Sequence, residues 1–191
     1  NTNDVDAGET ITEASSGGTD TISVITSTDF TNMSVGSFNE IEEICFEGTG
    51  QTATFTSGQI NSETISLKET STGISNIIIN VGSGENANFT AISAGTFDSG
   101  SDTVTINGNT GGENILGPDV ASTISGNAGN DTLTGGIAAD IINGGNDNDT
   151  LDGNYGADTL TGGAGNDIYL FNTNDVNAGE SIVEASSGGT D

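Results

Sequence analysis

The chain has 191 residues and carries 28 acidic side chains against one basic side chain, which gives a formal net charge of −27. This charge argues against nucleic acid and anionic membranes as partners, because both would repel the protein. It favours cations, since uncompensated like charge destabilises a compact fold. A disordered acidic chain is disfavoured, because Ile, Val and Thr are abundant and the apolar residues are periodic.

Missing residue types exclude further kinds of chemistry. The sequence contains no His, so it can form neither a Ser-His-Asp triad nor an HExxH zinc site, and we expect no enzymatic activity. The single Cys45 lies in an apolar run, which indicates a core position, and no disulfide can close within the chain. No apolar run approaches the roughly 18 residues of a membrane span, and neither a signal peptide nor an initiator Met is present, as expected of a mature or excised piece.

The first half of the chain shows short apolar runs separated by Gly, Ser, Thr and Asn, which predict strands. Residues 26–106 are therefore interpreted as a β-rich region, either a sandwich-like module or an irregular solenoid. The solenoid is favoured because Asp102–Asn107 leads into the next segment without a break. The run Ile77–Ile79 predicts a strand that is buried on both faces. The predicted strands are Thr21–Ile25, Ile41–Phe46, Ala53–Phe55, Thr64–Leu67, Ile77–Val81, Phe89–Ile92 and Thr103–Ile106.

From Gly108 onward a glycine recurs at every ninth residue, at 108, 117, 126, 135, 144, 153 and 162. The last five of these nonads fit the pattern GGxGxDxUx, in which U is a large apolar residue, and the first two are degenerate. Glycines permit the positive φ angles of a tight turn, so each nonad should form a turn followed by a short strand. The sixth positions are Glu113, Ser122, Asp131, Asp140, Asp149, Asp158 and Asp167, and the eighth are Ile115, Ile124, Leu133, Ile142, Leu151, Leu160 and Tyr169.

This pattern resembles the RTX (repeat-in-toxin) family of haemolysin-type calcium-binding nonapeptide repeats, which occur in large secreted bacterial adhesins and surface-layer proteins. The resemblance implies an all-β fold, a parallel β-roll, in which two nonads form one coil and calcium ions lie between stacked turns. The chemistry agrees, because calcium prefers six to eight oxygen ligands. Glycine-rich turns offer backbone carbonyls, and each aspartate adds a carboxylate.

Carried over to this chain, the resemblance implies two columns of acids and about three to five calcium ions. Ions are expected between Asp131 and Asp149, between Asp149 and Asp167, and between Asp140 and Asp158. A site that uses Glu113 should be weaker because Glu is longer than Asp, and the uncharged Ser122 weakens its own pair. Ala138 and Asp147 replace the usual fourth-position glycine, so distorted turns are expected there, and Asp147 could add a carboxylate. The expected carbonyl donors are the turn glycines Gly129, Gly136, Gly145, Gly156, Gly163 and Gly165.

The two ends of the chain repeat each other. Residues 172–191 match residues 1–20 at seventeen of twenty positions, so that Asn172 corresponds to Asn1 and Asp191 to Asp20. This predicts tandem units of about 171 residues, although matching caps on a single domain would give the same identity. We interpret residues 1–25 as a junction after a preceding unit, 107–171 as the roll and 172–191 as the start of the next unit. Tyr169 and Phe171 are expected to close the end of the roll.

These features predict an extracellular, calcium-stabilised structural repeat of a long surface protein or fibre, whose partners are calcium and neighbouring copies of the unit. In the RTX family, chains leave bacteria unfolded by type I secretion and fold on meeting calcium, so a cell-surface or extracellular location is expected. Adhesin, surface layer and filament remain alternatives. So do a module that binds glycan or ice and the calcium-binding tail of a secreted enzyme. The Thr-x-Thr pairs within Thr52–Thr56 and Thr103–Thr105 show no common period in the sequence, which disfavours ice.

Overall fold

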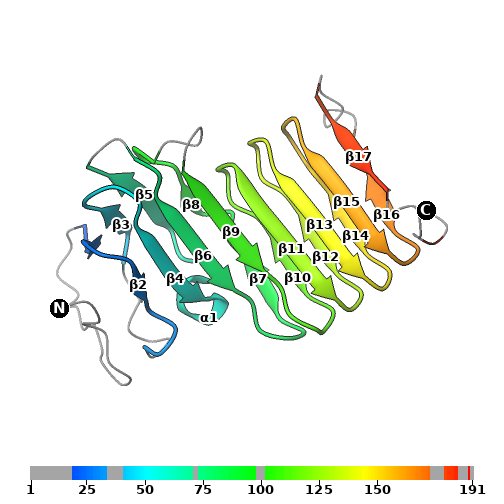
Figure 1. Cartoon of the computed structure of the whole chain (residues 1–191), viewed down its shortest axis with the longest axis horizontal. Coiled ribbons are helices and arrows are strands. Elements are labelled where there is room, and N and C mark those ends of the chain that lie inside the picture. Colours follow the sequence, from blue (N-terminus) through cyan, green and yellow to red (C-terminus); the bar gives the residue numbers. More distant parts are fainter. Residues whose placement is uncertain are drawn as a thin grey trace.

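The computed structural model describes residues 19–33, 41–70, 73–97, 102–172, 179–184 and 189. These residues form a parallel β-solenoid, as expected from the sequence (Figure 1). One eight-stranded parallel sheet, here called the long sheet, runs through the described residues from β2 to β17. It does not break at residue 106, so the solenoid interpretation of residues 26–106 is confirmed. Its strands are β2 (Thr28–Asp29), β4 (Thr52–Thr56), β6 (Asn76–Asn80), β9 (Thr103–Asn107), β11 (Ser122–Ala128), β13 (Ile141–Asn146), β15 (Thr159–Ala164) and β17 (Ser181–Val183).

Two shorter parallel sheets close the coils. A four-stranded sheet contains β1 (Thr21–Val24), β3 (Glu43–Phe46), β5 (Ile65–Glu69) and β8 (Ile92–Ser93). A five-stranded sheet contains β7 (Asn86–Asn88), β10 (Asn114–Leu116), β12 (Thr132–Thr134), β14 (Thr150–Asp152) and β16 (Ile168–Leu170). The short helix α1 (Ser57–Ile60) follows β4. Within the described ranges no helix has the length and apolar character needed to cross a membrane.

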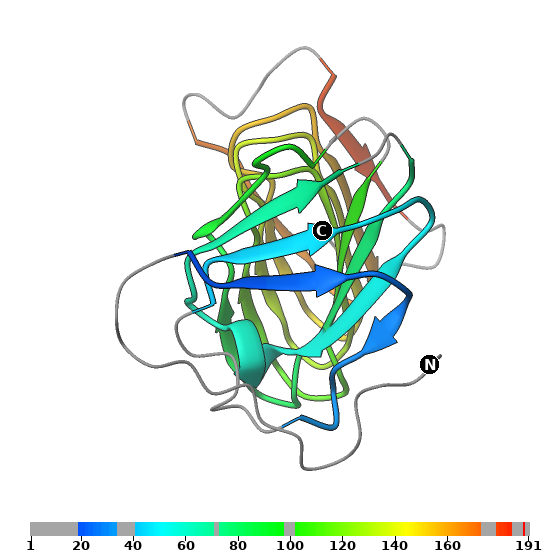
Figure 2. The ribbon, with the colours of Figure 1, turned by 90° about the vertical axis from the view of Figure 1, so that its left-hand side faces the viewer.

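The coils shorten along the solenoid axis. Thr52 pairs with Asn76 and Asn76 with Thr103, so these early coils take 24 and 27 residues. From Ser122 to Leu170 the interval is 18 residues, as between Ser122 and Asp140 and between Asp131 and Asp149, and it is 22 residues from Thr159 to Ser181. Two nonads therefore make one coil, as the resemblance implied. We call the coils within residues 19–106 the wide coils and those within 107–172 the narrow coils; Figure 2 looks along the axis from the wide end.

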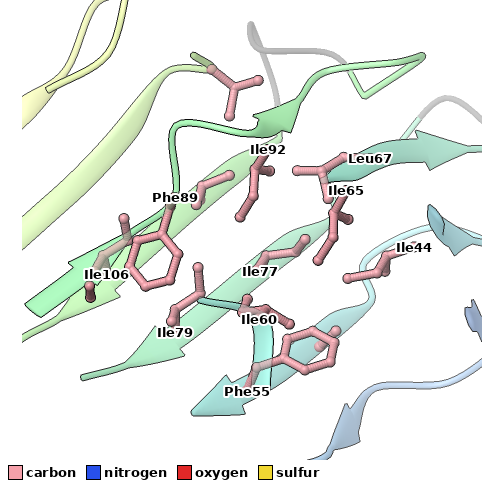
Figure 3. Close-up of a cluster of buried hydrophobic side chains, with 14 of the residues drawn as sticks. Ile44, Phe55, Ile60, Ile65, Leu67, Ile77, Ile79, Phe89, Ile92 and Ile106 are labelled. Carbon is pink, nitrogen blue, oxygen red and sulfur yellow. The ribbon is translucent and has the colours of Figure 1, made fainter. Parts of the chain in front are cut away.

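Core composition explains the change in coil length. The wide coils bury Phe30, Phe46, Phe55, Phe89 and Phe97 together with many isoleucines. Figure 3 shows Phe55 and Phe89 among these isoleucines. In the narrow coils each strand instead contributes one large apolar side chain, and these side chains are completely buried. They are Ile115, Ile124, Leu133, Ile142, Leu151 and Leu160. Such a core is thin, so less apolar burial supports each narrow coil than each wide coil.

Two local strand predictions were wrong. Ile77 and Ile79 are buried, but Ile78 between them lies half-exposed on the outer face. A solenoid sheet has only one face toward the core, so the strand cannot be buried on both. No continuous strand covers 89–92 either, because the Asn88 side chain accepts a hydrogen bond from the backbone N–H of Thr90 and forms a turn there.

The far end of the roll is only partly closed. Tyr169 packs against the core as expected, and its hydroxyl accepts a hydrogen bond from the Gly162 N–H at 2.7 Å. Phe171 does not contribute to this closure, because it remains 42% exposed. The junction assigned to residues 1–25 is described only from Thr19 onward, and residues 1–18 lie outside the described part of the chain.

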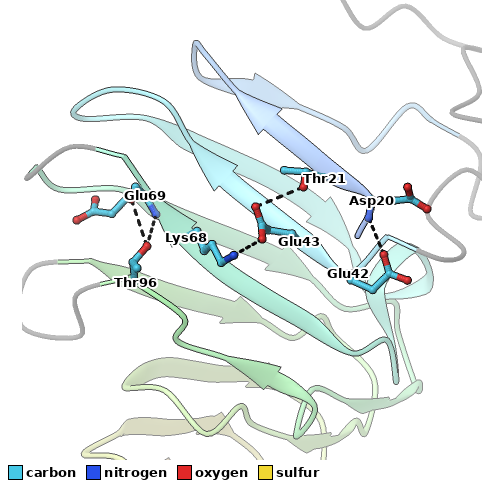
Figure 4. A network of polar contacts seen from close by, with 7 residues as sticks. All are labelled: Asp20, Thr21, Glu42, Glu43, Lys68, Glu69 and Thr96. Atoms are coloured by element: carbon cyan, nitrogen blue, oxygen red, sulfur yellow. Dashed lines mark hydrogen bonds and ion pairs between the residues drawn. The ribbon is translucent and has the colours of Figure 1, made fainter. Parts of the chain in front are cut away.

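The chain's only basic residue lies on the outer face of the four-stranded sheet. Lys68 forms an ion pair with Glu43, which also accepts a hydrogen bond from the Thr21 hydroxyl (Figure 4). Beside them the backbone N–H of Asp20 donates to Glu42 at 2.8 Å. An exposed ion pair of this kind stabilises a protein by less than about 1 kcal/mol. The net negative charge therefore has to be compensated elsewhere.

Turn glycines bring neighbouring coils into backbone contact, and Gly145 provides a test of this contact. It has a φ of +117°, and a Cβ there would lie 2.2 Å from the Asn127 carbonyl oxygen. Gly145→Ala should therefore destabilise the protein by roughly 2 kcal/mol more than Gly84→Ala, because overpacking adds to the conformational cost. Gly84 is a matched control, since its φ is +71° and a Cβ there would have no other atom within 4 Å. Urea unfolding measures both losses, and equal losses would contradict the backbone contact.

Candidate metal centre

The sixth-position residues of the nonads form two columns at opposite edges of the narrow coils. One column immediately precedes the strands of the five-stranded sheet, and the other lies at or just before the starts of strands in the long sheet. All members of both columns are buried. The first column contains Glu113, Asp131, Asp149 and Asp167, and the second contains Ser122, Asp140 and Asp158.

One oxygen of each aspartate fastens its coil to the coil before it. The Oδ1 atom of Asp149 accepts a hydrogen bond from the backbone N–H of Asp131 at 2.8 Å. Asp167 accepts in the same way from Asp149 at 2.8 Å, and Asp158 from Asp140 at 2.8 Å. These bonds hold successive coils in register. They leave the second carboxylate oxygen, Oδ2, for another role.

The second oxygens of three aspartates lack hydrogen-bond donors. The Oδ2 atoms of Asp131, Asp149 and Asp158 are buried and accept no hydrogen bond. A buried carboxylate oxygen loses its water without replacement, which is costly for the charged form. A cation beside each oxygen would remove this cost.

Glycines leave room for such a cation beside the first column. A Cβ on Gly144 would lie 2.3 Å from Asp149 Oδ2 and 2.7 Å from the carbonyl oxygen of Gly162. A Cβ on Gly126 would lie 2.2 Å from Asp131 Oδ2 and 2.6 Å from the carbonyl oxygen of Gly144. A carboxylate oxygen of one coil and a carbonyl oxygen of the next therefore border the same small space. These hard oxygen donors suit calcium.

Most of the turn glycines expected as carbonyl donors adopt backbone conformations that other residues rarely take. Gly129, Gly145, Gly156, Gly163 and Gly165 have φ angles between +109° and +154°. This conformation turns the chain tightly enough to bring carbonyl groups toward the neighbouring coil. The structure therefore places these five glycines in the turns beside the acid columns.

The turn that contains Gly136 and Ala138 differs from the others. Neither residue has a positive φ, and the Gly136 N–H donates to Asp140 Oδ2 at 2.8 Å. Alanine carries a Cβ that disfavours the left-handed conformation, so the distortion expected there is present. Asp147, in contrast, adopts a φ of +77°, and the distortion expected there is absent. Its carboxylate accepts a hydrogen bond from the Gly129 N–H at 3.2 Å.

Asp140 and Glu113 differ from Asp131, Asp149 and Asp158 because both of their oxygens have donors. Asp140 Oδ1 accepts from the backbone N–H and the hydroxyl of Ser122, at 2.8 and 2.9 Å. Glu113 accepts from the Gly84 N–H at 2.7 Å and from the Asn109 N–H at 3.0 Å. A bound cation would therefore stabilise Asp131, Asp149 and Asp158 more than Asp140 or Glu113.

Backbone oxygens must supply most ligands of any ion in these columns. Across the residues that the structure describes, no group of three or more His, Cys, Asp or Glu side chains could hold a metal ion by itself. Each coil instead offers one carboxylate and several turn carbonyls. Stacking two coils doubles this set, which approaches the six to eight oxygens that calcium prefers.

Comparison with protein families agrees with this geometry. Residues 107–142, 121–151 and 143–172 match the RTX calcium-binding nonapeptide repeat (4 copies). Residues 107–172 are therefore similar to RTX calcium-binding repeats, and we call them the RTX segment. Searches of curated proteins and of solved structures gave no match. The family match thus covers the narrow coils, and the wide coils are characterised by their structure alone.

Burial in the RTX segment raises the carboxyl pKa values. The pKa of Asp149 is raised to about 7, mainly by loss of water; the Asp131 N–H lowers it, and the charges of Asp131 and Asp167 add to the increase. The same loss of water raises the pKa of Asp131 and of Asp158 to about 6. Burial also raises the pKa of Asp140. Without metal at neutral pH, ionisation of these buried carboxyls therefore costs more free energy than ionisation of the same groups in water.

The raised pKa values predict how calcium-free protein responds to pH. Each folded-state pKa exceeds the ordinary value near 4, so the protonated groups favour folding at low pH and this contribution is lost as pH rises through 6 to 7. In calcium-free buffer the RTX segment should therefore show more β-structure by far-ultraviolet circular dichroism at pH 5.5 than at pH 8. A calcium-free β signal that is equal or larger at pH 8 would contradict the burial of these carboxyls.

Two acids that the sequence analysis missed extend the columns. Glu85 precedes β7 and shares the register of Glu113, because Asn86 pairs with Asn114. Glu180 precedes β17, and its carboxylate accepts a hydrogen bond from the Asp158 N–H at 3.3 Å. Neither acid stands at a multiple of nine from the sixth positions of the nonads, so both fell outside the nonad register. A signal for Glu85 was present, since 84–86 and 112–114 both read Gly-Glu-Asn.

Proposed function

We propose that the chain is a calcium-stabilised structural unit of a long extracellular repeat protein, and that calcium drives the folding of its RTX segment after secretion. The observation that supports this most strongly is the set of buried Oδ2 atoms of Asp131, Asp149 and Asp158, which lack hydrogen-bond donors. Without a cation they oppose folding at neutral pH. With a cation they join one coil to the next.

The geometry favours particular residues for each ion. Asp131 with the Gly144 carbonyl, and Asp149 with the Gly162 carbonyl, border the two best-formed spaces. The pair Asp140 and Asp158 forms a third proposed site. A site at Glu113 is the weakest, because backbone N–H groups already occupy both of its oxygens. Three to five ions in all fit these columns, and the bound metal supplies the positive charge that the chain lacks.

A role outside the cell follows from the metal requirement. Calcium is scarce in the cytosol and abundant outside, so a chain of this kind stays unfolded during a type I secretion step and folds on release. No catalytic role is proposed, since the buried acids of the RTX segment are assigned to metal binding. Adhesin, surface layer and filament all fit such a stiff calcium-loaded unit.

Electron microscopy of negatively stained native material, with and without calcium, tests this function. Long filaments, a lattice or extended rods in calcium, lost on chelation, would each support a structural role and would distinguish fibre, surface layer and adhesin. Compact particles that do not change on chelation would contradict it.

A second candidate function is a module that binds neutral glycan or ice, and the outer face of the long sheet favours it. Register aligns uncharged side chains in two rows along this face, although the chain carries a net charge of −27. Because the wide coils differ in length, the aligned residues do not recur at a fixed spacing, and the sequence alone does not show these rows. One row contains Thr54, Ile78, Thr105, Thr123, Ile141 and Thr159, and the other contains Thr56, Asn80, Asn107, Ser125, Asn143 and Thr161.

Charge placed on these rows tests the second candidate. Thr105→Lys with Thr123→Lys should abolish retention on neutral polysaccharide beads or on ice, while calcium-dependent melting stays unchanged. Both positions lie on the outer face of the long sheet and are only partly buried. Absence of retention for the unmodified chain would remove this candidate.

A further inference from the structure

We infer that successive units share one uninterrupted solenoid, and that β17 shows how the start of one unit docks on the end of the unit before it. The occupant of the docking site at β15 and β16 is then the N-terminal segment of a second copy of the unit. This inference rests on the tandem arrangement within the proposed function.

The contacts of β17 define what the docking site requires. Strand β17 extends the long sheet in parallel with β15, with Leu160 opposite Ile182. The Ser181 N–H donates to the Asp158 carbonyl at 2.8 Å, and Glu180 accepts from the Asp158 N–H at 3.3 Å. Around the end of the roll, Glu184 bonds to the Tyr169 hydroxyl. A second anchor is the bond from the Gly189 N–H to the Gly165 carbonyl at 2.6 Å.

Residues 1–20 carry every one of these groups. When residues 172–191 are aligned with residues 1–20, Glu180, Ile182, Glu184 and Gly189 correspond to Glu9, Ile11, Glu13 and Gly18. The three differences between the copies fall at positions 177, 181 and 183. Residues 181 and 183 are exposed and belong to the strand pairing through their backbone. Residues 1–20 of a second copy can therefore make the contacts with β15 and β16 that residues 172–191 make.

The length of the chain allows the solenoid to continue. Ser181 corresponds to Thr10, so in a tandem array the copy of β2 would follow Ser181 at the separation at which Thr28 follows Thr10. This separation equals the interval of 18 residues between stacked positions of the narrow coils, such as Asp131 and Asp149. It is shorter than the 27 residues between Asn76 and Thr103, which begin two neighbouring strands of the long sheet. The copy of β2 can therefore follow β17 as the next strand of the same sheet.

The end of the solenoid also exposes an apolar side chain that a further coil would cover. Ile182 lies opposite the buried Leu160 but is 48% exposed, because no strand follows β17 among the described residues. Four more apolar side chains at this end, on β16, β17 and the residue after β16, are 42–56% exposed: Ile168, Leu170, Phe171 and Val183. Figure 1 shows β16 and β17 together at this end. Sheet edges with exposed apolar side chains pair readily with another strand, and isolated proteins usually protect them. The first coil of a following unit, with Ile22 and Val24 turned inward, fits this position.

Substitutions in the two copies of the segment test the inference in the full chain. Ser181→Pro with Ile182→Asp removes the bond to Asp158 and places a charge opposite Leu160, so it should vacate the docking site. In calcium this variant should form head-to-tail oligomers through residues 9–13 of another copy, because a heterologous contact that does not close is open-ended. The matched control adds Thr10→Pro and Ile11→Asp and should sediment as a monomer. Equal sedimentation of the two variants would overturn the inference.

A peptide experiment tests the same docking directly. A fluorescent peptide of residues 1–20 should bind the Ser181→Pro/Ile182→Asp chain in calcium, with at least a tenfold preference over a scrambled peptide. Equal binding of both peptides, or binding of neither, would overturn the inference. Calcium-dependent gain of β-structure in the same variant is recorded alongside. Its presence without peptide binding would leave the proposed function standing while the shared solenoid fails.

Discussion

Removal of calcium at pH 7.5 should unfold the RTX segment while most of the wide coils stay folded. The narrow coils bury one large apolar side chain per strand and several carboxyls whose pKa values lie at about 6 or 7. A site at a hundredfold excess of calcium over its dissociation constant adds about 2.7 kcal/mol, so three sites add about 8 kcal/mol. This is comparable to the whole stability of a typical domain. Losing it should leave residues 107–172 without a stable fold.

Hydrogen exchange read by mass spectrometry resolves this loss along the chain. Peptides from 114–170 should exchange rapidly in chelator, whereas peptides from β3 to β6 should stay protected by the Phe and Ile core of the wide coils. Far-ultraviolet circular dichroism should lose part of its β signal in parallel. Unchanged protection of the RTX segment in excess chelator would show that calcium is not structural.

Asp149→Asn should change stability in opposite directions with and without calcium. In calcium, the variant weakens the sites on both sides of Asp149 and should lose up to about 5 kcal/mol, the contribution of two sites at a hundredfold excess. Without calcium at pH 8, it should keep more β-structure than the unmodified chain, because it removes a buried charge that lacks a donor at Oδ2. The amide oxygen of Asn can still accept the hydrogen bond from the Asp131 N–H.

Asp119→Asn provides the matched control for this inversion. It removes the same charge from the same segment, but Asp119 is exposed to solvent. Its effect should be small in both conditions. Thermal melts of the three proteins in calcium, and their far-ultraviolet circular dichroism signals in chelator at pH 8, measure the comparison. If Asp149→Asn destabilised the protein equally in both conditions, Asp149 would be a structural hydrogen-bond acceptor and not a metal ligand.

The nonad pattern predicted the narrow coils well because their structure is strictly periodic. Glycine fixes the turns, the eighth position supplies the core, and an interval of 18 residues stacks Asp131, Asp149 and Asp167 as expected. The state of each carboxylate was not predictable in the same way. Asp140 resembles Asp149 in the sequence, but the neighbouring Ala138 keeps the turn out of the left-handed conformation and lets Gly136 donate to Asp140.

The wide coils were harder to predict because their length varies. Coils of 24 and 27 residues share one sheet, so no fixed period shows which residues are neighbours. Because of the same variation, the sequence analysis could not assign Glu85 to the acid column. It also could not predict the rows of Thr and Asn on the outer face. Hydrophobic alternation located most strands there, but it gave neither their pairing nor the inward face of Ile77–Ile79.

Anomalous diffraction from crystals grown in calcium would test the central claim most directly, because it locates each ion against the carboxylates. We predict peaks between stacked turns beside the Oδ2 atoms of Asp131 and Asp149, with a further peak in the second column at Asp158. We expect none at exposed acids such as Asp119. Peaks confined to exposed acids, or no ordered peak within the RTX segment, would contradict the assignment of calcium to the buried columns.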